Sequence, residues 1–470
     1  MMPDVIMIEN RTFDEIAIGD SASIAKKLTG QDIELFALVS GDVNPAHMDP
    51  AFAKTDIFQS IIAHGMWGGG LISSVLGMEL PGPGTVYLSQ SLRFLGPVRV
   101  ADTITATVTV TEKQAEHHRV MLDCRCVNQH GEDVIVGQAE VKAPTEKVRR
   151  AQINLPDVKI ARHDRYRALL AAVADGEPIL TAVVHPCDAS SLLAVADAAR
   201  RRMITPILVG PQPKIRATAA ACGVDISDFR MVDTAHSHAA AAQAVALIRS
   251  GEAQLLMKGS LHTDELMSSV MANDTGLRTD RRLSHIYLMD VPSYPRPLLI
   301  TDAAINIEPT LADKADIIRN AIDLAHAIGI DLPRVAILAA VETVNPKMRS
   351  TLDAAALCKM ADRGQIVGGL IDGPLAFDNA VSPEAARDKA IVSPVAGCAD
   401  ILVVPDIEAG NMLAKQLTFL AGADAAGIVL GARVPIILTS RADSERTRIA
   451  SCALAVLMAR QRLLAAQAAT

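Results

Sequence analysis

The stretch AHGMWGGGLISSVLGME, residues 63–79, decides the fold of the first third of the chain. Its apolar residues follow a helical pattern, yet it contains three consecutive glycines. Each glycine inside a helix costs roughly 1 kcal/mol relative to alanine, so the helix needs close packing of its backbone as compensation. The stretch therefore predicts a helix wrapped by a curved antiparallel sheet.

The segments that would form this sheet follow the helix. From about residue 85 to residue 142, four runs rich in Val, Ile and Thr are separated by turns, for example at Gly96-Pro97. This pattern is typical of meandering strands. Another helix is expected earlier, with Thr29 as its N-cap. We therefore expect an α+β domain over residues 10–145.

The pattern changes after a charged, proline-containing linker at residues 146–165. Short apolar strands then alternate with alanine-rich helices as far as residue 470, which is typical of doubly wound α/β sheets. We expect two αβα lobes with a cleft between them. Lobe 1 would comprise about 166–305 plus 435–470, and lobe 2 about 306–434.

Composition limits the classes of function. The 470 residues are 50% hydrophobic and 3% aromatic, with a net charge of -8, so the chain lacks the positive excess and the stacking residues of a nucleic-acid-binding protein. Its seven cysteines have no metal-ligand spacing. With no visible signal peptide or membrane span, we expect a cytoplasmic protein with free thiols and no bound metal.

The stretch SGDVNPAHMDP, residues 40–50, contains several titratable side chains and several residues that favour turns. Asp42 and His47 flank Asn44-Pro45 just after a predicted helix. The simpler interpretation is an Asx-turn with His47 on the surface. The alternative is an acid–base pair that holds a water molecule against a substrate.

The longer stretch ALVSGDVNPAHMDPAFAKTDIFQSIIAHGMWGGGLIS, residues 37–73, resembles the MaoC-like, (R)-specific enoyl-CoA hydratase family, and the resemblance covers residues 10–142. It implies a hot-dog fold, with Asp42 and His47 as the catalytic pair. The amide of Gly65, at the start of the central helix, suits an oxyanion donor. Asn44 and His64 would support the substrate, although His64 could equally be a hydrogen-bonded core histidine.

The second region resembles the phosphate acetyl/butyryl transferase family over about residues 169–464. The matching stretches include MKGSLHTDELM (257–267), ITDAAINIEPTLADK (300–314), GGLIDGPLAFDNA (368–380) and LTSRADS (438–444). The resemblance implies acyl transfer between coenzyme A and inorganic phosphate. Coenzyme A thioesters, acyl phosphate and phosphate would be substrates, without any bound cofactor.

Several residues of this region are candidates for the transferase site. Ser440-Arg441 follows an apolar strand and opens the last helix, where a hydroxyl, a guanidinium and a helix N-terminus can bind an anion. Arg278 is a second candidate cation or a surface ion pair, and Lys258 ends a strand, where α/β sheets bind ligands. The remaining candidates would line the cleft, cap helices or orient the chain: Asp302, Asn306, Asp378 and Asn411.

One position departs from the family pattern. Acetyl-specific members carry an aspartate where this chain has Thr447, so Asp443 is our candidate base for the coenzyme A thiol. The S-R-x-D-S form resembles butyryl-type members. The sequence therefore suggests a bifunctional, homo-oligomeric hydratase and transferase. The alternative is a transferase whose hot-dog domain only binds acyl-CoA or mediates oligomerisation, and a thioesterase has no support from the motifs.

Overall fold

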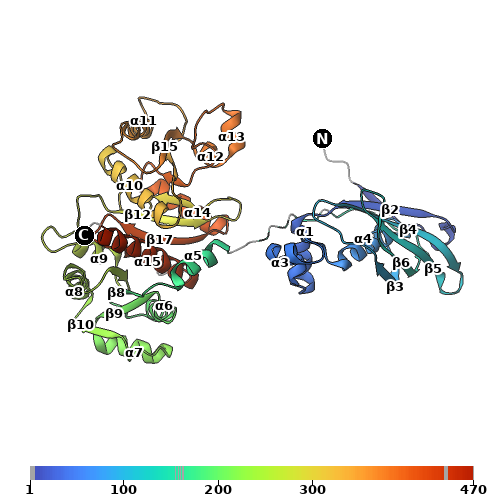
Figure 1. Ribbon diagram of the computed structural model, residues 1–470, viewed down its shortest axis with the longest axis horizontal. Helices are drawn as coiled ribbons and strands as arrows, with labels where there is room; N and C mark the ends of the chain where they lie inside the picture. The colour runs from blue at the N-terminus through green and yellow to red at the C-terminus, as the bar shows by residue number, and fades with distance from the viewer. Residues whose placement is uncertain are drawn as a thin grey trace. The chain divides into compact units, whose positions relative to one another are not determined.

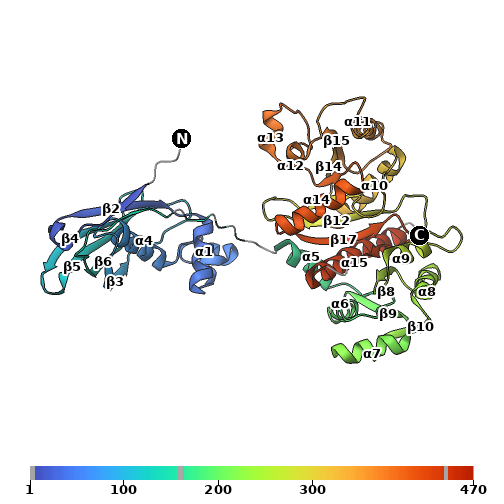
Figure 2. The same ribbon diagram turned by 180° about the vertical axis from the view of Figure 1, so that it is seen from behind.

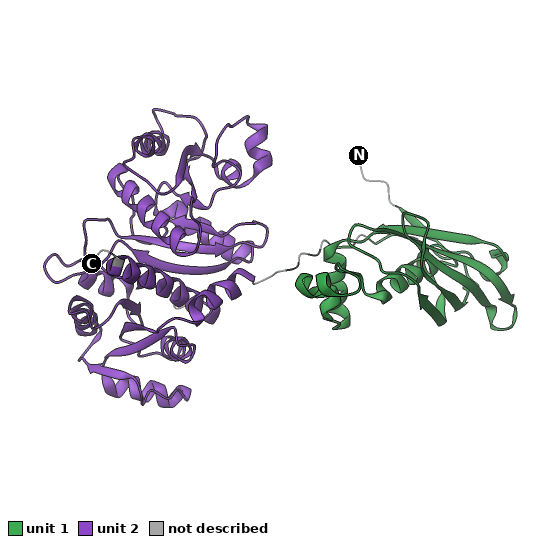
Figure 3. Ribbon diagram, viewed as in Figure 1, with its two compact units in different colours: residues 1–160 green, residues 161–470 purple. Residues whose placement is uncertain are grey.

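The computed structural model describes residues 6–468 except 154, 157, 159, 161–163 and 439–442. The chain divides into two compact units, residues 1–160 and residues 161–470 (Figure 3). Each unit has its own hydrophobic core, and each is described by itself.

Unit 1 consists of a five-stranded antiparallel sheet, in the order β2-β4-β5-β6-β3, that packs against α4 (Figure 1). A short two-stranded sheet pairs β1 with β7. The elements are β1 (Met7–Glu9), β2 (Ser21–Lys27), α1 (Gly30–Ser40), α2 (Pro45–Met48), α3 (Pro50–Thr55), α4 (Gly65–Met78), β3 (Val86–Phe94), β4 (Thr103–Gln114), β5 (Arg119–Val127), β6 (Asp133–Lys142) and β7 (Arg149–Ala151).

Two of the three consecutive glycines of α4 allow the close packing that the sequence predicts. A Cβ atom at Gly68 would lie 2.3 Å from Cδ1 of Ile135 in β6, and one at Gly69 would lie 3.2 Å from Cδ1 of Leu92 in β3. Gly70 would meet nothing within 4 Å. The hot-dog arrangement is confirmed, because the helix backbone lies directly on the side chains of the sheet.

The sheet strands alternate as the sequence predicts. Every second residue of β4 from Ile104 to Val110 is buried. On β5, Cys124 and Cys126 both face the core as free thiols. Burial disfavours the thiolate and raises the pKa of Cys124 to about 11 and that of Cys126 to about 12. These two cysteines are therefore inert packing residues.

Unit 2 is built on one 11-stranded sheet in the order β10-β9-β8-β11-β18-β17-β12-β13-β16-β14-β15. Its strands are β8 (Ile179–Val184), β9 (Ile204–Gly210), β10 (Arg230–Asp233), β11 (Leu255–Lys258), β12 (Ser284–Asp290), β13 (Leu298–Thr301), β14 (Arg334–Leu338), β15 (Leu370–Leu375), β16 (Ile401–Val403), β17 (Asp424–Leu430) and β18 (Ile436–Ile437). Its helices are α5 (Asp164–Ala174), α6 (Ala189–Arg200), α7 (Gln212–Cys222), α8 (Ser237–Arg249), α9 (Thr263–Met271), α10 (Leu311–Ala327), α11 (Arg349–Asp362), α12 (Phe377–Val381), α13 (Pro383–Asp388), α14 (Ile407–Leu420) and α15 (Glu445–Ala468).

The predicted α/β class is confirmed, and the sheet is continuous through both halves. The central strands β12 and β17 are antiparallel to each other and to the strands on either side. They reverse the direction of the sheet at its middle. As a result, β8, β11 and β18 run opposite to β13, β14, β15 and β16, and the pairings place the last residues of β18, β13 and β16 (Ile437, Thr301 and Val403) in one row across the sheet.

Helices cover both faces of this sheet (Figures 1 and 2). Residues of α6, α10, α11 and α15 pack on one face, and residues of α8, α9 and α14 pack on the other. Among the described residues, one helix, α15, is long and apolar enough to cross a membrane. Its buried residues, such as Ile449 and Ala453, belong to the core of unit 2, which accounts for its apolar character.

Candidate active sites

The loop after α1 is shaped by local hydrogen bonds. Gly41 ends the helix with a left-handed φ of 75°, and its N–H donates to the carbonyl of Ala37 at 2.8 Å. The N–H of Asn44 donates to Oδ1 of Asp42 at 3.1 Å, and Oδ1 of Asn44 caps α2 by accepting from the N–H of Ala46 at 3.1 Å. The Asx-turn, which was the simpler interpretation of this stretch of sequence, is therefore present.

The same turn brings three titratable side chains together. Asp42, His47 and His64 each offer a ligand atom within 4.8 Å of the others, and the two imidazole rings are 4.0 Å apart between centroids. Nδ1 of His47 lies 2.9 Å from the carbonyl oxygen of Ile62. Because a carbonyl only accepts, Nδ1 carries the proton, and Nε2 keeps a lone pair for use as a base.

His64 is a buried residue at the N-cap of α4. Its Nε2 lies 3.0 Å from the carbonyl oxygen of Asp42, so the ring fastens the loop to the start of the helix. Its Nδ1 is buried without a hydrogen-bond partner. Phe36 also packs against the ring, with 4.9 Å between centroids.

A cavity of about 290 Å³ opens beside these histidines and is lined mainly by apolar side chains. His47, His64 and Gly65 line it, and a Cβ atom at Gly65 would lie 2.9 Å from the ring of Phe94. Gly65 is the first residue of α4, where backbone N–H groups have no acceptor within the helix. Asn44 is exposed and caps α2, and neither Asn44 nor Asp42 is among the residues that line the cavity.

In unit 2, three predicted residues meet at the carboxyl end of β13. Asp302 is buried and accepts hydrogen bonds from the N–H groups of Ala304 and Asn306, at 2.9 and 3.0 Å. Burial raises the pKa of this carboxyl despite those bonds. Nδ2 of Asn411 donates to the carbonyl of Ala303 at 3.2 Å. These contacts form a turn after β13 rather than a helix cap, because the next helix, α10, begins at Leu311 with Thr310 as its N-cap.

Lys258 is the last residue of β11, and Asp443 follows β18 in the chain. Lys258 is buried. Burial raises the pKa of the neighbouring Tyr287, and the negative charge of Asp443 raises it further. Ser440 and Arg441 lie outside the described residues. The pairings of β11, β18, β17, β12 and β13 place Met257 in the same row of the sheet as Thr301, so Lys258 and Asp302 both lie next to this row, with three strands between β11 and β13.

The last two predicted residues, Arg278 and Asp378, are exposed. Arg278 donates from Nη1 to Oδ1 of Asn273 at 2.7 Å. Asp378, in α12 after β15, lies 3.4 Å from Nζ of Lys389. The backbone N–H of Asn379 and this lysine hold the pKa of Asp378 below its usual range. Both side chains are engaged in local polar contacts on the surface.

The sequence analysis missed His185 and Asp188, which follow β8 beside Lys258. Nδ1 of His185 lies 2.9 Å from the carbonyl oxygen of Ser260. The available signal was the histidine directly after the apolar run ILTAVV, since carboxyl ends of parallel strands commonly bind ligands. It also missed a polar cavity of about 180 Å³ lined by Lys314 and Arg349 at the N-termini of α10 and α11.

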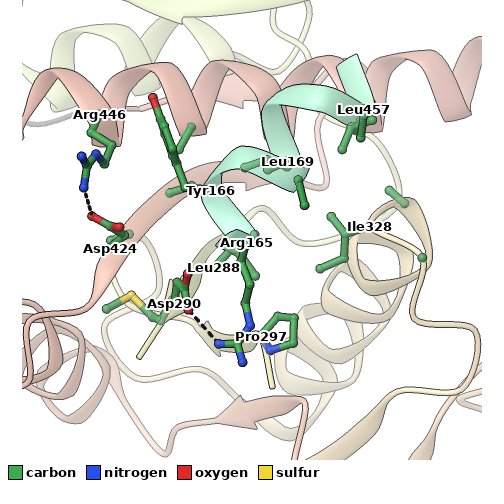
Figure 4. A pocket seen from close by; sticks show the side chains of 18 residues that line it. Arg165, Tyr166, Leu169, Leu288, Asp290, Pro297, Ile328, Asp424, Arg446 and Leu457 are labelled. Atoms are coloured by element: carbon green, nitrogen blue, oxygen red, sulfur yellow. Dashed lines mark hydrogen bonds and ion pairs between the residues drawn. The ribbon is translucent and has the colours of Figure 1, made fainter. Parts of the chain in front are cut away.

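A larger apolar pocket of about 450 Å³ lies between α5, α15 and the central strands β12 and β17 (Figure 4). Two ion pairs border it: Nη1 of Arg165 lies 2.7 Å from Asp290, and Nη1 of Arg446 lies 3.6 Å from Asp424. The residues that line it do not include any predicted site residue. Its walls come from segments too far apart in the chain for a local pattern to reveal them.

Comparisons with known proteins agree with this division of the chain. Residues 17–123 match the family described as MaoC like domain, and residues 237–456 match that described as phosphate acetyl/butaryl transferase. The phosphate acetyltransferase of Rhizobium meliloti is 63% identical over 309 residues, which are 66% of this chain and 98% of that protein.

Two solved structures are also similar. A branched-chain phosphotransacylase from Enterococcus faecalis is 31% identical, with a TM-score of 0.53, and the match covers 60% of this chain and 99% of that one. The R-hydratase PhaJ1 from Pseudomonas aeruginosa is 41% identical, with a TM-score of 0.32, and covers 33% of this chain and 100% of that one. The chain therefore belongs to the phosphate acetyl/butyryl transferase family and carries a MaoC-like domain in front of the transferase region.

Proposed function

We propose that the chain is a bifunctional enzyme of acyl-CoA metabolism. Unit 1 would hydrate trans-2-enoyl-CoA to (R)-3-hydroxyacyl-CoA, and unit 2 would transfer an acetyl group between coenzyme A and inorganic phosphate. For unit 1 the supporting observation is the tautomer of His47: the hydrogen bond to Ile62 leaves Nε2 unprotonated beside Asp42. A non-catalytic scaffold has no need of this arrangement.

The hydration uses these groups in a simple sequence. Asp42 and His47 hold one water, a base among them accepts its proton, and the oxygen forms a bond to C3 of the enoyl chain. Electron density moves to the thioester oxygen, which the Gly65 N–H at the start of α4 stabilises. A proton returns to C2, so water is added without any change of oxidation state. The apolar cavity beside His47 receives the acyl chain.

The test of unit 1 follows the loss of the conjugated enoyl absorbance in the full-length protein. Asp42→Asn and His47→Gln should each lower hydration by about 100-fold or more, as expected for removal of a general acid or base. His130→Gln, an exposed histidine of the same unit, is the matched control and should leave the rate unchanged. If the wild-type protein does not hydrate enoyl-CoA of short or medium chain length, the assignment of unit 1 as a hydratase is refuted.

For unit 2, the 63% identity to a phosphate acetyltransferase supports acetyl transfer. A phosphate oxygen attacks the thioester carbonyl, the carbon–sulfur bond breaks, and coenzyme A leaves as a thiolate that takes up a proton. In the reverse direction a base must remove that proton. Thr447 has no carboxylate to act as that base, and its hydroxyl lies 3.0 Å from that of Ser444 at the start of α15. Asp443 is the proposed base.

Two variants distinguish Asp443 from its neighbours. Asp443→Asn should slow formation of acyl-CoA from acyl phosphate by about 100-fold, and the remaining rate should rise with pH as free thiolate accumulates. Glu445→Gln, which changes an exposed carboxylate two residues away, should have little effect. Equal losses in both variants would contradict the role of Asp443. Comparison of acetyl-CoA with butyryl-CoA tests the proposed acyl group.

The alternative is a transferase whose hot-dog domain only binds acyl-CoA or mediates oligomerisation. It predicts that His47→Gln changes no measurable rate. Release of thiol from an acyl-CoA in the absence of phosphate would instead favour a thioesterase on the same fold.

A further inference from the structure

The cluster of Asp42, His47 and His64 has the composition of a metal site. One carboxylate and two imidazoles offer ligand atoms that all lie within 4.8 Å of one another. Three protein ligands of these types, with a position left open for water, are typical of a mononuclear zinc centre. The spacing along the chain, 42, 47 and 64, belongs to no familiar metal motif, so only the folded loop brings the three together.

The hydrogen bonds of the two histidines are those of metal ligands. Histidine ligands almost always donate their second ring N–H to a carbonyl or carboxylate, which fixes the tautomer and directs the free lone pair. Here Nδ1 of His47 donates to the carbonyl of Ile62, and Nε2 of His64 donates to the carbonyl of Asp42. Each ring therefore keeps one unprotonated nitrogen: Nε2 in His47 and Nδ1 in His64.

The free nitrogen of His64 is the second, independent observation. His64 is only 3% exposed, and its Nδ1 is buried without a hydrogen-bond partner. An unpaired buried polar atom is destabilising. A cation bound to this nitrogen would satisfy it.

The site needs only a small adjustment to hold an ion. Ligands of a tetrahedral zinc, with bonds of about 2.0–2.1 Å, lie roughly 3.3 Å apart. Asp42 is exposed, and the bond from the N–H of Asn44 occupies only Oδ1. Its carboxylate can therefore approach the histidines, which are already held in place by their carbonyl partners.

We propose that Asp42, His47 and His64 bind one Zn²⁺ ion reversibly and that the ion inhibits hydration. The inhibition rests on the proposed hydratase function, while the binding does not. Zinc takes the lone pair of His47 that would accept the proton of water, and it occupies the position of that water. The base is then lost without any change in the fold, and acyl transfer by unit 2 continues.

The experiment uses the full chain, stripped of metal by a chelator. Binding is measured by equilibrium dialysis with Zn²⁺ and by visible absorption with Co²⁺ as a probe, which separates nitrogen and oxygen ligation from binding by the free cysteines. Wild type and His130→Gln should bind equally. Asp42→Asn and His64→Gln should bind more than about tenfold more weakly, since loss of an outer-shell partner alone weakens binding about 10–100-fold.

Asp42→Asn keeps the acceptor for the Asn44 N–H, so it should fold even if His64→Gln does not, and its weaker binding cannot be attributed to unfolding. Equal metal affinity in wild type and Asp42→Asn would overturn the site. Binding without inhibition of hydration would overturn the inhibitory role. A wild-type protein that binds zinc at this site but never hydrates enoyl-CoA would refute the hydratase function and leave the metal site standing.

Discussion

At the scale of single residues, Gly68 and Gly70 of α4 provide a matched pair. A methyl group at Gly68 would overlap the side chain of Ile135, whereas one at Gly70 meets nothing. Gly68→Ala should therefore destabilise unit 1 by about 1–3 kcal/mol through overpacking, and Gly70→Ala should stabilise it by up to about 1 kcal/mol. Trp67 is the single tryptophan of the chain, so urea unfolding followed by its fluorescence reports on this unit. Shifts of the same sign for both variants would contradict the packing argument.

His285 gives unit 2 a dependence on pH. The ring is fully buried, and burial lowers its pKa from 6.5 to about 4. Between those values the unfolded chain binds a proton that the folded protein does not. The contribution of His285 to the free energy of unfolding is therefore fully present above pH 6.5. It decreases by about 3 kcal/mol as the pH falls toward 4.

The control for this prediction is His285→Gln, which cannot titrate. Carboxylates contribute to acid unfolding of both proteins, so the quantity to compare is the difference in unfolding free energy between them. That difference should shrink as the pH decreases from 6.5 to 4. A difference that stays constant would mean that His285 is protonated in the folded protein.

Residues that act through local turn chemistry could be predicted from the sequence, and those that depend on distant partners could not. The Asx-turn at Asp42 and the cap at Thr29 follow from neighbours three residues away or fewer. The unpaired Nδ1 of His64 depends on how α4 meets the loop. Asp302 is similar: its motif predicts a polar residue after a strand, but not its burial.

At the scale of elements, Lys314 and Asp353 join α10 to α11. Nζ of Lys314 lies 2.8 Å from Oδ2 of Asp353, and both side chains are buried. Lys314→Met leaves the carboxylate largely uncompensated, with Arg349 at 3.7 Å as its remaining partner. We expect this variant to lose about 3 kcal/mol of stability.

The double variant Lys314→Met, Asp353→Leu should recover most of that loss, because replacing both charges of a buried pair by apolar groups is often close to neutral. Calorimetry of unit 2 would measure both values. If the double variant is instead as unstable relative to wild type as Lys314→Met, the attraction between the two charges exceeds the cost of their desolvation.

The direction of the two central strands could not be predicted from the sequence. β12 begins with Ser284-His285 and ends with Asp290, whereas β17 has a buried apolar run, AAGIVL, of the kind also typical of parallel strands. The direction of a strand in the sheet cannot be predicted from its apolar pattern, because a strand buried on both faces is apolar in either orientation. The reversal of the sheet could therefore be found only from its pairings.

At the scale of the whole molecule, the cores of the two units share no residue. Unit 1 is also fastened at both ends, since β7 pairs with β1 and the N–H of Gln152 donates to the carbonyl of Ile6 at 2.8 Å. These contacts make residues 1–160 a self-contained folding unit.

We therefore expect two thermal transitions, because separate cores unfold separately. A Gly68→Ala change should shift only the transition reported by Trp67 fluorescence, and His285→Gln should shift only the other. Fragments 1–160 and 161–470, expressed apart, should each reproduce the transition of the corresponding unit. The second fragment should keep its acyl-transfer rate, since all the residues assigned to that reaction lie within it. A single transition that both substitutions displace equally would mean that the units are coupled.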